Sequence, residues 1–197
     1  MQKKIAVIND LSGYGRCSLT VAIPVLSAMG HQCCPIPTAI LSNHTEFPVY
    51  FFDDYTEKMT TYTDKWKELG LSFDAIATGF LGSEAQIGIV MEIVQKLKAE
   101  KTFVVVDPVM VATSGAKLIS DAYETYTPEM CEQMKELVCM ADVVLPNVTE
   151  CCILTDTPYR EENWTRKELL NMAMMLRLMG AKSVVITGVR EGSCYTN

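Results

Sequence analysis

The feature of this sequence that most constrains its fold is the regular alternation of short apolar runs with longer segments of helical periodicity. The alternation predicts strands at residues 4–9, 32–40, 74–78, 103–106, 143–145 and 183–187, and helices at 16–29, 55–69, 83–99, 127–140 and 165–180. Parallel strands need a crossover between them, so this order is typical of an α/β fold with a mainly parallel sheet and helices on both faces. We therefore expect one α/β domain over residues 1–197.

Local signals set several element boundaries. Residues 83–86 and 165–168 both match the capping box that opens a helix, since Ser or Thr is followed three positions later by Gln or Glu. Pro35 and Pro37 cannot donate a backbone hydrogen bond, which favours an edge position for their strand. Residues 40–54 form the one long stretch without a clear pattern, and such stretches often carry function.

Composition narrows the functional classes. Charged residues make up 21% and hydrophobic residues 49%, as in ordinary globular proteins, and no apolar run approaches the roughly 20 residues of a membrane helix. The net charge of −7 argues against a nucleic-acid partner. Eight cysteines without a C-x-x-C pair, together with only two histidines, argue against a zinc site. The start of the sequence does not resemble a signal peptide, so we expect a cytoplasmic protein with free thiols and no membrane partner.

Polar, glycine or proline residues follow five of the predicted strands, at 9–13, 78–80, 107–108, 146–147 and 187–188. In open α/β sheets, ligands bind beyond the carboxyl ends of the strands. We therefore expect these five strand ends to line a ligand crevice.

A glycine-rich segment follows the first predicted strand. Residues 13–18 (GYGRCS) nearly fit the dinucleotide fingerprint G-x-G-x-x-G, but Ser18 replaces the third glycine. The acidic residue expected about 20 positions later is also absent. The interpretation of this chain as a nucleotide-dependent oxidoreductase therefore depends on this weak match alone.

Two acidic groups follow neighbouring predicted strands. Asp107 ends one strand and precedes Pro108, and Asn147-x-x-Glu150 follows the next. Two such carboxylates can hold Mg²⁺ through water, because Mg²⁺ prefers oxygen ligands and keeps several waters. The alternative is structural, with Asp107 capping a turn while Asn147 and Glu150 cap the next helix. Taken singly, each group favours the structural role, whereas the pair favours a site for Mg²⁺ and phosphate.

Six segments together form a pattern that is characteristic of a known family. They are residues 5–15, 42–45 (SNHT), 78–83 (TGFLGS), 107–110 (DPVM), 146–150 (PNVTE) and 184–188 (VVITG). With them the chain resembles the bacterial pyridoxal (pyridoxine/pyridoxamine) kinases of the ribokinase-like superfamily. The resemblance implies a transferase of vitamin B6 salvage that uses ATP and Mg²⁺ to phosphorylate the 5′-hydroxymethyl group of pyridoxal, pyridoxine or pyridoxamine. It also implies a homodimer.

The resemblance implies roles for residues near the substrate. His44 and Thr45 match positions that close over the pyridine ring. Either Asp10 or Ser12 matches the polar position that meets the ring. Phe80 stands beside the substrate where many members have tyrosine, so a hydrogen bond to the ring is lost there.

The resemblance also implies roles for residues that bind the nucleotide phosphates. Asp107, Asn147 and Glu150 match residues around Mg²⁺ and the nucleotide phosphates, with Asp107 and Glu150 as metal ligands. Thr187 matches a threonine that contacts the nucleotide. These roles suit phosphoryl transfer, which depends on positioning and charge neutralisation.

The sequence departs from the family at its end. Family members continue into a segment with a G-T-G-D motif, whose backbone binds phosphate at a helix N-terminus and whose aspartate is the catalytic base. The motif does not occur in these 197 residues. The resemblance therefore implies that they are the N-terminal two-thirds of a ribokinase-like kinase domain, contain no catalytic base, and are inactive alone.

Two other functions stay open besides that of a nucleotide-dependent oxidoreductase. Hydroxymethylpyrimidine kinases of thiamine synthesis share the fold, and Asp10 would suit their aminopyrimidine substrate. A non-catalytic B6-binding protein would explain the missing base. Melting shifts with pyridoxal, with the aminopyrimidine alcohol, and with pyridoxal in the absence of ATP would distinguish these functions.

Overall fold

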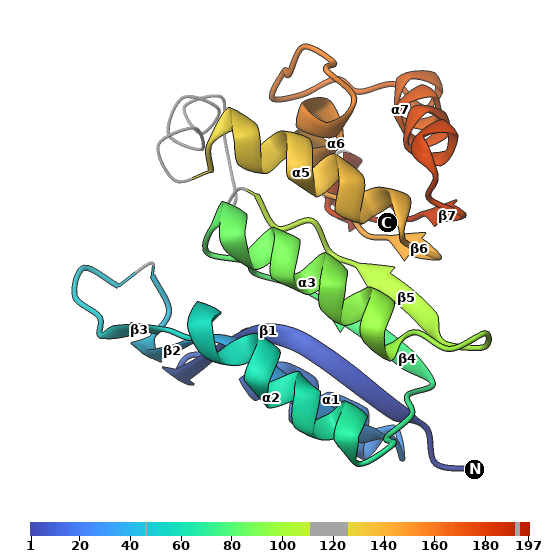
Figure 1. Ribbon diagram of the computed structural model, residues 1–197. Helices are drawn as coiled ribbons and strands as arrows, with labels where there is room; N and C mark the ends of the chain where they lie inside the picture. Colours follow the sequence, from blue (N-terminus) through green and yellow to red (C-terminus); the bar gives the residue numbers. More distant parts are fainter. Residues whose placement is uncertain (46, 111–125, 192–193) are drawn as a thin grey trace. The chain divides into compact units, whose positions relative to one another are not determined.

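The computed structural model describes residues 1–45, 47–110, 126–191 and 194–197 (Figure 1). Contacts between residues divide the chain into two compact units, Met1–Val104 and Val105–Asn197. Both units have the predicted α/β character, with mostly parallel strands and intervening helices, while the single domain expected from the sequence stays a prediction. No helix in the described part of the chain has the length and apolar character that crossing a bilayer requires.

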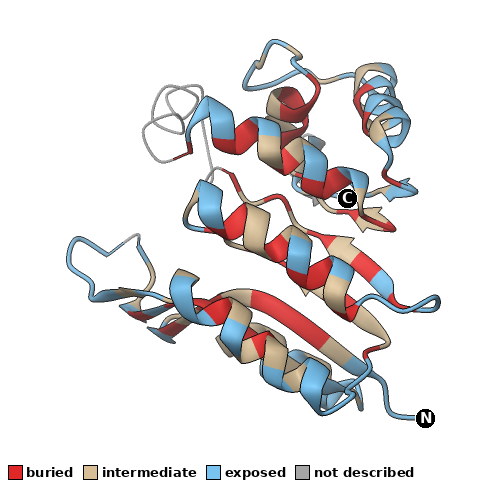
Figure 2. Ribbon diagram, viewed as in Figure 1, coloured by how far each residue is buried: buried red, intermediate tan, exposed pale blue. Residues whose placement is uncertain are grey.

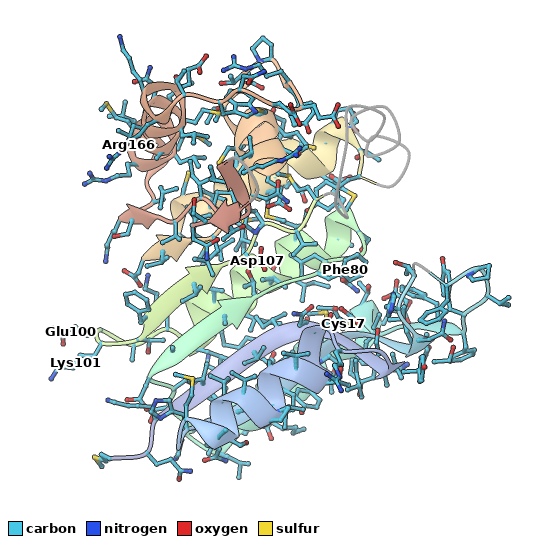
Figure 3. The ribbon with its side chains drawn as sticks, turned by 180° about the vertical axis from the view of Figure 1, so that it is seen from behind. Cys17, Phe80, Glu100, Lys101, Asp107 and Arg166 are labelled. Atoms are coloured by element: carbon cyan, nitrogen blue, oxygen red, sulfur yellow. The ribbon has the colours of Figure 1, made fainter. Side chains whose placement is uncertain are left out.

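The first unit alternates strands and helices. Its elements are β1 (Lys4–Tyr14), α1 (Ser18–Ala28), β2 (Gln32–Asn43), β3 (Phe52–Asp54), α2 (Thr56–Glu68), β4 (Ala75–Thr78), α3 (Glu84–Leu97) and the start of β5 (Phe103–Val106). Strand order is β3-β2-β1-β4, with β1 parallel to β2 and β4, and β3 antiparallel to β2. Helices α2 and α3 lie on one face of these strands and α1 lies on the other, as Figures 1 and 3 together show.

The core of the first unit is built around β1. Ala6 and Ile8 are completely buried, and Val7 is almost so, which means that both faces of the strand are covered (Figure 2). In the neighbouring strands, Ile36 of β2 pairs with Ile8, and Ile76 of β4 pairs with Ala6. Ile36 and Ile76 are also completely buried. A central parallel strand is buried on both faces and therefore needs a continuous apolar run. The apolar run at the start of the sequence thus explains the central position of β1 in the sheet.

β1 is longer than predicted. The prediction ended the strand at Asn9, but β1 continues to Tyr14 and pairs with β2 as far as Asn43. The register shifts just after Asn9, which places Asp10 at a β-bulge-like irregularity inside the strand. Polar residues suggested a strand end because the sequence does not show that their side chains find hydrogen-bond partners within the sheet.

The predicted edge position of β2 holds for only half of the strand. β3 pairs with Ala39–Leu41, whereas Pro35 and Pro37 lie in the half that is not paired with β3. Proline is tolerated there because no ladder hydrogen bond is required of it on that side. In the described part of the chain, the irregular stretch predicted at 40–54 shrinks to residues 44–45 and 47–51, since β2 and β3 both extend into it.

The second unit contains the end of β5 and the strands β6 and β7, and these three strands are parallel. Its further elements are α5 (Pro128–Cys139), β6 (Val143–Val144), α6 (Val148–Leu154), α7 (Arg166–Met179), β7 (Ser183–Val184), β8 (Val189–Glu191) and β9 (Cys194–Thr196). β6 pairs with β5 and with β7, and α5, α6 and α7 pack against one another. The last predicted strand, 183–187, is shorter in the structure. The antiparallel β8–β9 pair was missed because its three-residue strands are too short to produce a pattern.

Candidate active site

Five predicted site residues lie in the first unit and are called here the first-unit cluster: Asp10, Ser12, His44, Thr45 and Phe80. Asp10 and Ser12 are two residues apart in β1 and are 6% and 0% exposed. The Ser12 hydroxyl donates a 2.8 Å hydrogen bond to Oδ2 of Asp10. Burying a carboxylate and a hydroxyl costs free energy unless they are hydrogen-bonded. The bond between Asp10 and Ser12 reduces this cost and keeps a polar group in the interior of the unit. The sequence analysis left open whether Asp10 or Ser12 meets the substrate ring, and in the structure the two side chains are hydrogen-bonded to each other.

Asn9 ties the loop after β4 to β1. Its Oδ1 accepts hydrogen bonds from the backbone N–H groups of Asp10 and Phe80, each at 3.0 Å. A Cβ at Gly79 would lie 2.3 Å from Nδ2 of Asn9, so the close approach requires glycine. Phe80 follows directly, beyond the end of β4 (Figure 3). Asn9 thereby fixes this loop next to Asp10, a role that its place in the sequence did not reveal.

His44 and Thr45 come after the last residue pair of β1 and β2, further along these strands than the Asp10–Ser12 pair. The His44 ring packs on Phe47, with centroids 4.6 Å apart, while Thr45 is exposed. Gly15 has a φ of +125°, and a Cβ there would approach Cδ2 of His44 to 2.6 Å. Gly15 of the G-x-G segment therefore makes room for His44, which argues against the dinucleotide interpretation.

Gln86 is a residue of this region whose role the sequence prediction described incorrectly. The capping box predicted at 83–86 is only half present, because Oγ of Ser83 accepts from the N–H of Gln86 at 3.2 Å. The Gln86 side chain does not return to Ser83. Instead its Oε1 accepts from the N–H of Gly82 and its Nε2 donates to the carbonyl of Thr38, both at 2.8 Å. The burial of Gln86, which indicates this role, is known only from the structure.

Four further predicted residues lie in the second unit and are called here the second-unit cluster: Asp107, Asn147, Glu150 and Thr187. Asp107 follows β5, Asn147 and Glu150 follow β6, and Thr187 follows β7. The N–H of Thr187 donates to the carbonyl of Pro146 at 2.8 Å, and Thr187 forms a parallel bridge with Asn147. Because the three strands are parallel neighbours, the cluster gathers at one end of them, as the sequence predicts.

Glu150 is buried, with 3% of its surface exposed. Its Oε2 accepts from the N–H of Asn147 at 2.8 Å, and Oδ1 of Asn147 accepts from the N–H of Glu150 at 2.9 Å. The structural alternative raised from the sequence, a cap on α6, is therefore confirmed. Oε1 accepts a longer bond from the N–H of Met110 at 3.3 Å, which ties the segment after β5 to the carboxylate.

Asp107 is half-buried, and burial alone raises its pKa to about 6. A carboxylate removed from water is stabilised by a nearby cation, so this residue fits the outer sphere of a divalent ion. The described residues contain no group of three or more His, Cys, Asp or Glu that would enclose a metal. Asp107 and Glu150 nevertheless fit Mg²⁺, which is commonly held by one or two carboxylates together with water and substrate phosphates.

Comparison with known proteins identifies the class. Residues 21–196 match the family model of the phosphomethylpyrimidine kinases, and the chain belongs to that family. A pyridoxal kinase of Leifsonia xyli is 28% identical over 196 residues, covering 95% of this chain and 65% of the relative. A thiamine biosynthetic bifunctional enzyme of Arabidopsis thaliana is 26% identical over 191 residues, covering 93% of this chain and 33% of that enzyme.

Solved structures agree with the fold. A Bacteroides thetaiotaomicron protein assigned to the phosphomethylpyrimidine kinases, crystallised with pyridoxal, is 42% identical with a TM-score of 0.88, over 98% of this chain and 65% of that one. Pyridoxal kinase of Lactobacillus plantarum is 28% identical with a TM-score of 0.83, over 96% and 65%. The chain thus spans just under two thirds of the two pyridoxal kinases and of the Bacteroides protein, and one third of the Arabidopsis enzyme. The predicted ribokinase-like α/β fold and the resemblance to pyridoxal kinases are confirmed.

Proposed function

We propose that the full-length protein transfers the γ-phosphoryl group of ATP to the 5′-hydroxymethyl group of pyridoxal, pyridoxine or pyridoxamine. The observation that carries the proposal is the buried Asp10–Ser12 pair in a chain 42% identical to a protein crystallised with pyridoxal. Family membership supports phosphoryl transfer to a substituted methyl group on a nitrogen heterocycle. Such transfer needs fixed geometry and charge neutralisation more than covalent chemistry.

The first-unit cluster is proposed to bind the vitamer. Asp10 and Ser12 present a carboxylate and a hydroxyl that can bond the polar substituents of the ring. Phe80 offers an aromatic face, and His44 and Thr45 cover the ring. The backbone of Phe80 is fixed through Asn9, which supports a preformed surface for a flat ligand.

The second-unit cluster is proposed to bind the nucleotide phosphates. Mg²⁺ held near Asp107 and Glu150 would neutralise phosphate charge. Asn147 and Thr187, adjacent through their parallel bridge, would contact the nucleotide. The proton acceptor for the hydroxymethyl group is not assigned to any of these residues, because the resemblance places it in a G-T-G-D motif that the sequence does not contain.

Hydroxymethylpyrimidine kinase is the second candidate. The family description and the relative from thiamine biosynthesis favour it, and the Asp10 carboxylate would accept hydrogen bonds from an aminopyrimidine. The two candidates share ATP and Mg²⁺ and differ only in the ring that the first-unit cluster accepts.

A homodimer and a cytoplasmic location complete the proposal. Large apolar side chains are exposed around β3, among them Val49, Phe51 and Phe52, which supports a partner surface there. Analytical ultracentrifugation of the full chain would test the dimer. A monomer at micromolar concentration would contradict it.

The test of function is a competition between substrates. The full-length protein is supplied with ATP, Mg²⁺ and equimolar pyridoxal and hydroxymethylpyrimidine, and the phosphorylated products are separated by chromatography. We expect pyridoxal 5′-phosphate to predominate. Predominance of the pyrimidine phosphate would establish the second candidate, and binding of pyridoxal without turnover would establish a non-catalytic B6-binding protein.

A further inference from the structure

Gln86 lies in the first turn of α3, and only 1% of its surface is exposed. A buried primary amide has one acceptor and two donor hydrogens that need partners inside the protein. The helix cap uses only the backbone N–H of Gln86, which bonds to Oγ of Ser83. The side chain is therefore available for other contacts.

The Gln86 side chain joins three parts of the first unit. Its Oε1 holds the N–H of Gly82, in the loop at 79–83, at 2.8 Å. Its Nε2 reaches the carbonyl of Thr38 in β2 and Oγ1 of Thr56 at the start of α2, each at 2.8 Å, and Oδ1 of Asp54 in β3 at 3.1 Å. One amide thus connects the loop to β2 and to the junction between β3 and α2.

This network reaches Phe80 through Thr38. The hydroxyl of Thr38 donates to the carbonyl of Phe80 at 3.0 Å, while the N–H of Phe80 is held by Asn9. Both backbone groups of Phe80 are therefore fixed, and the residue that holds its carbonyl is itself held by Gln86. Leu81, the next residue, is completely buried and anchors the same loop.

The network requires an amide at position 86. The Thr56 hydroxyl donates to the Asp54 carboxylate, so Oγ1 of Thr56 must accept its bond from Gln86. Burial raises the pKa of Asp54, but hydrogen bonds from Thr56 and Gln86 outweigh this effect and keep the pKa below its usual range. A carboxylate in place of the amide would face the ionised Asp54 and the carbonyl of Thr38, with no hydrogen to donate to either.

We propose that Gln86 is a positioning residue that sets the loop at 79–83 so that Phe80 lies against the substrate ring. The inference rests on the proposed function, because it takes the ring to be that of a B6 vitamer. Gln86 does not touch the vitamer in this account. It acts through Gly82, Thr38 and the backbone of Phe80.

The test compares variants of the full-length protein. Gln86→Glu keeps the shape but removes the donor, and Gln95→Glu makes the same chemical change at an exposed position of α3. We expect Gln86→Glu to weaken pyridoxal affinity and raise KM for pyridoxal by about tenfold, the scale of one unsatisfied buried group. KM for ATP should stay within about twofold, and Gln95→Glu should resemble the wild type.

Adding Asp54→Asn to Gln86→Glu returns a donor to the network and should recover most of the lost pyridoxal affinity. If Gln86→Glu does not fold, Gln86→Met serves instead, with a rise of about threefold in KM for pyridoxal alone. An unchanged KM for pyridoxal, or equal rises for pyridoxal and ATP, would overturn the positioning role. Absence of wild-type turnover with pyridoxal would instead overturn the proposed function, so the two failures are distinguishable.

Discussion

The two clusters are held together by different kinds of contact. In the second-unit cluster the central bonds are local, since Asn147 and Glu150 are three residues apart and cap each other's backbone, while Met110 and Thr187 join this pair from other segments. In the first-unit cluster Asp10 and Ser12 also form a local bond, but Phe80 is bonded to distant parts of the chain. Phe80 is held by Asn9, 71 residues away, and by Thr38, 42 residues away. The position of Phe80 therefore depends on the tertiary structure of its unit, whereas the Asn147–Glu150 pair uses a motif within one helical turn.

The clusters also differ in how they treat a buried acid. Asp10 shares a short hydrogen bond with Ser12 inside its own strand. Asp107 is subject to burial alone, which raises its pKa to about 6. The Asp10 carboxylate therefore has a hydrogen-bond donor within its own strand before any ligand arrives. The second carries an acid that a bound cation would stabilise, so the comparison predicts different responses to mutation and to Mg²⁺.

The largest expected effect is on Mg²⁺ dependence. Glu150→Gln removes the charge and places an amide hydrogen against the N–H of Asn147 or Met110. In the full-length protein we expect the Mg²⁺ concentration for half-maximal activity to rise by about 10–100-fold, with partial recovery at excess Mg²⁺. Glu129→Gln, an acid in the first turn of α5, is the matched control and should leave the Mg²⁺ dependence unchanged. Unchanged dependence in Glu150→Gln would leave this residue with the capping role alone.

The second effect is on the stability of the first unit. Gly79→Ala forces Asn9 to move, and both hydrogen bonds to Oδ1 of Asn9 are lost with that movement. We expect a loss of about 1–3 kcal/mol in the free energy of unfolding, measured with urea. Gly88→Ala, inside α3 with open space around the new Cβ, should instead gain about 0.5–1 kcal/mol. Equal behaviour of the two alanine variants would contradict the tight Asn9–Gly79 contact.

The third effect depends on pH. The pKa of Asp107 is raised in the folded state, so the folded protein binds this proton more tightly than the unfolded chain. The free energy of unfolding therefore falls as pH rises from about 4 through about 6, because the folded protein loses a proton that it binds more tightly than the unfolded chain does. Above this pH range the whole destabilisation by the ionised Asp107 is present. Asp107→Asn should raise Tm by about 2–4 °C at pH 7.5 and have little effect near pH 4. A Tm difference that does not vary with pH would refute the burial of this acid.

The smallest effect concerns the exposed Thr45. Thr45→Ala should weaken pyridoxal binding by about 1 kcal/mol, or about fivefold, because one hydrogen bond to the ligand is lost. ATP affinity should stay unchanged in the same titrations. Thr61→Ala, an exposed threonine on α2, is the control. Equal losses for both ligands in Thr45→Ala would indicate a folding defect rather than a contact with the ring.

Local sequence signals predicted most of the fold and the second-unit cluster. Capping patterns marked the starts of α5 and α7, where Thr127 and Thr165 accept the expected backbone bonds. The Asn147–Glu150 pattern was recognisable for the same reason, since every partner in it lies within one turn. Parallel strand order then placed Asp107 and Thr187 at the same end of the strands.

Long-range contacts limited what could be predicted of the first-unit cluster. Asn9 looked like a strand terminator, although its side chain holds a loop 71 residues away. Gln86 matched a capping box, yet its side chain bonds to Gly82 and Thr38 rather than to Ser83. Polar side chains that bond across a sheet leave no periodic pattern, so their partners become known only from the tertiary structure.

The central claim is a division of roles, with the ring bound by the first-unit cluster and Mg²⁺ with phosphate by the second. Calorimetric titration of the full chain with pyridoxal, and separately with Mg²⁺ and a non-hydrolysable ATP analogue, tests it most directly in Asp10→Asn and Asp107→Asn. We predict that Asp10→Asn weakens pyridoxal binding alone and that Asp107→Asn weakens binding of the Mg²⁺–nucleotide alone. Equal weakening of both ligands in either variant, or no pyridoxal binding by the wild type, would contradict the account.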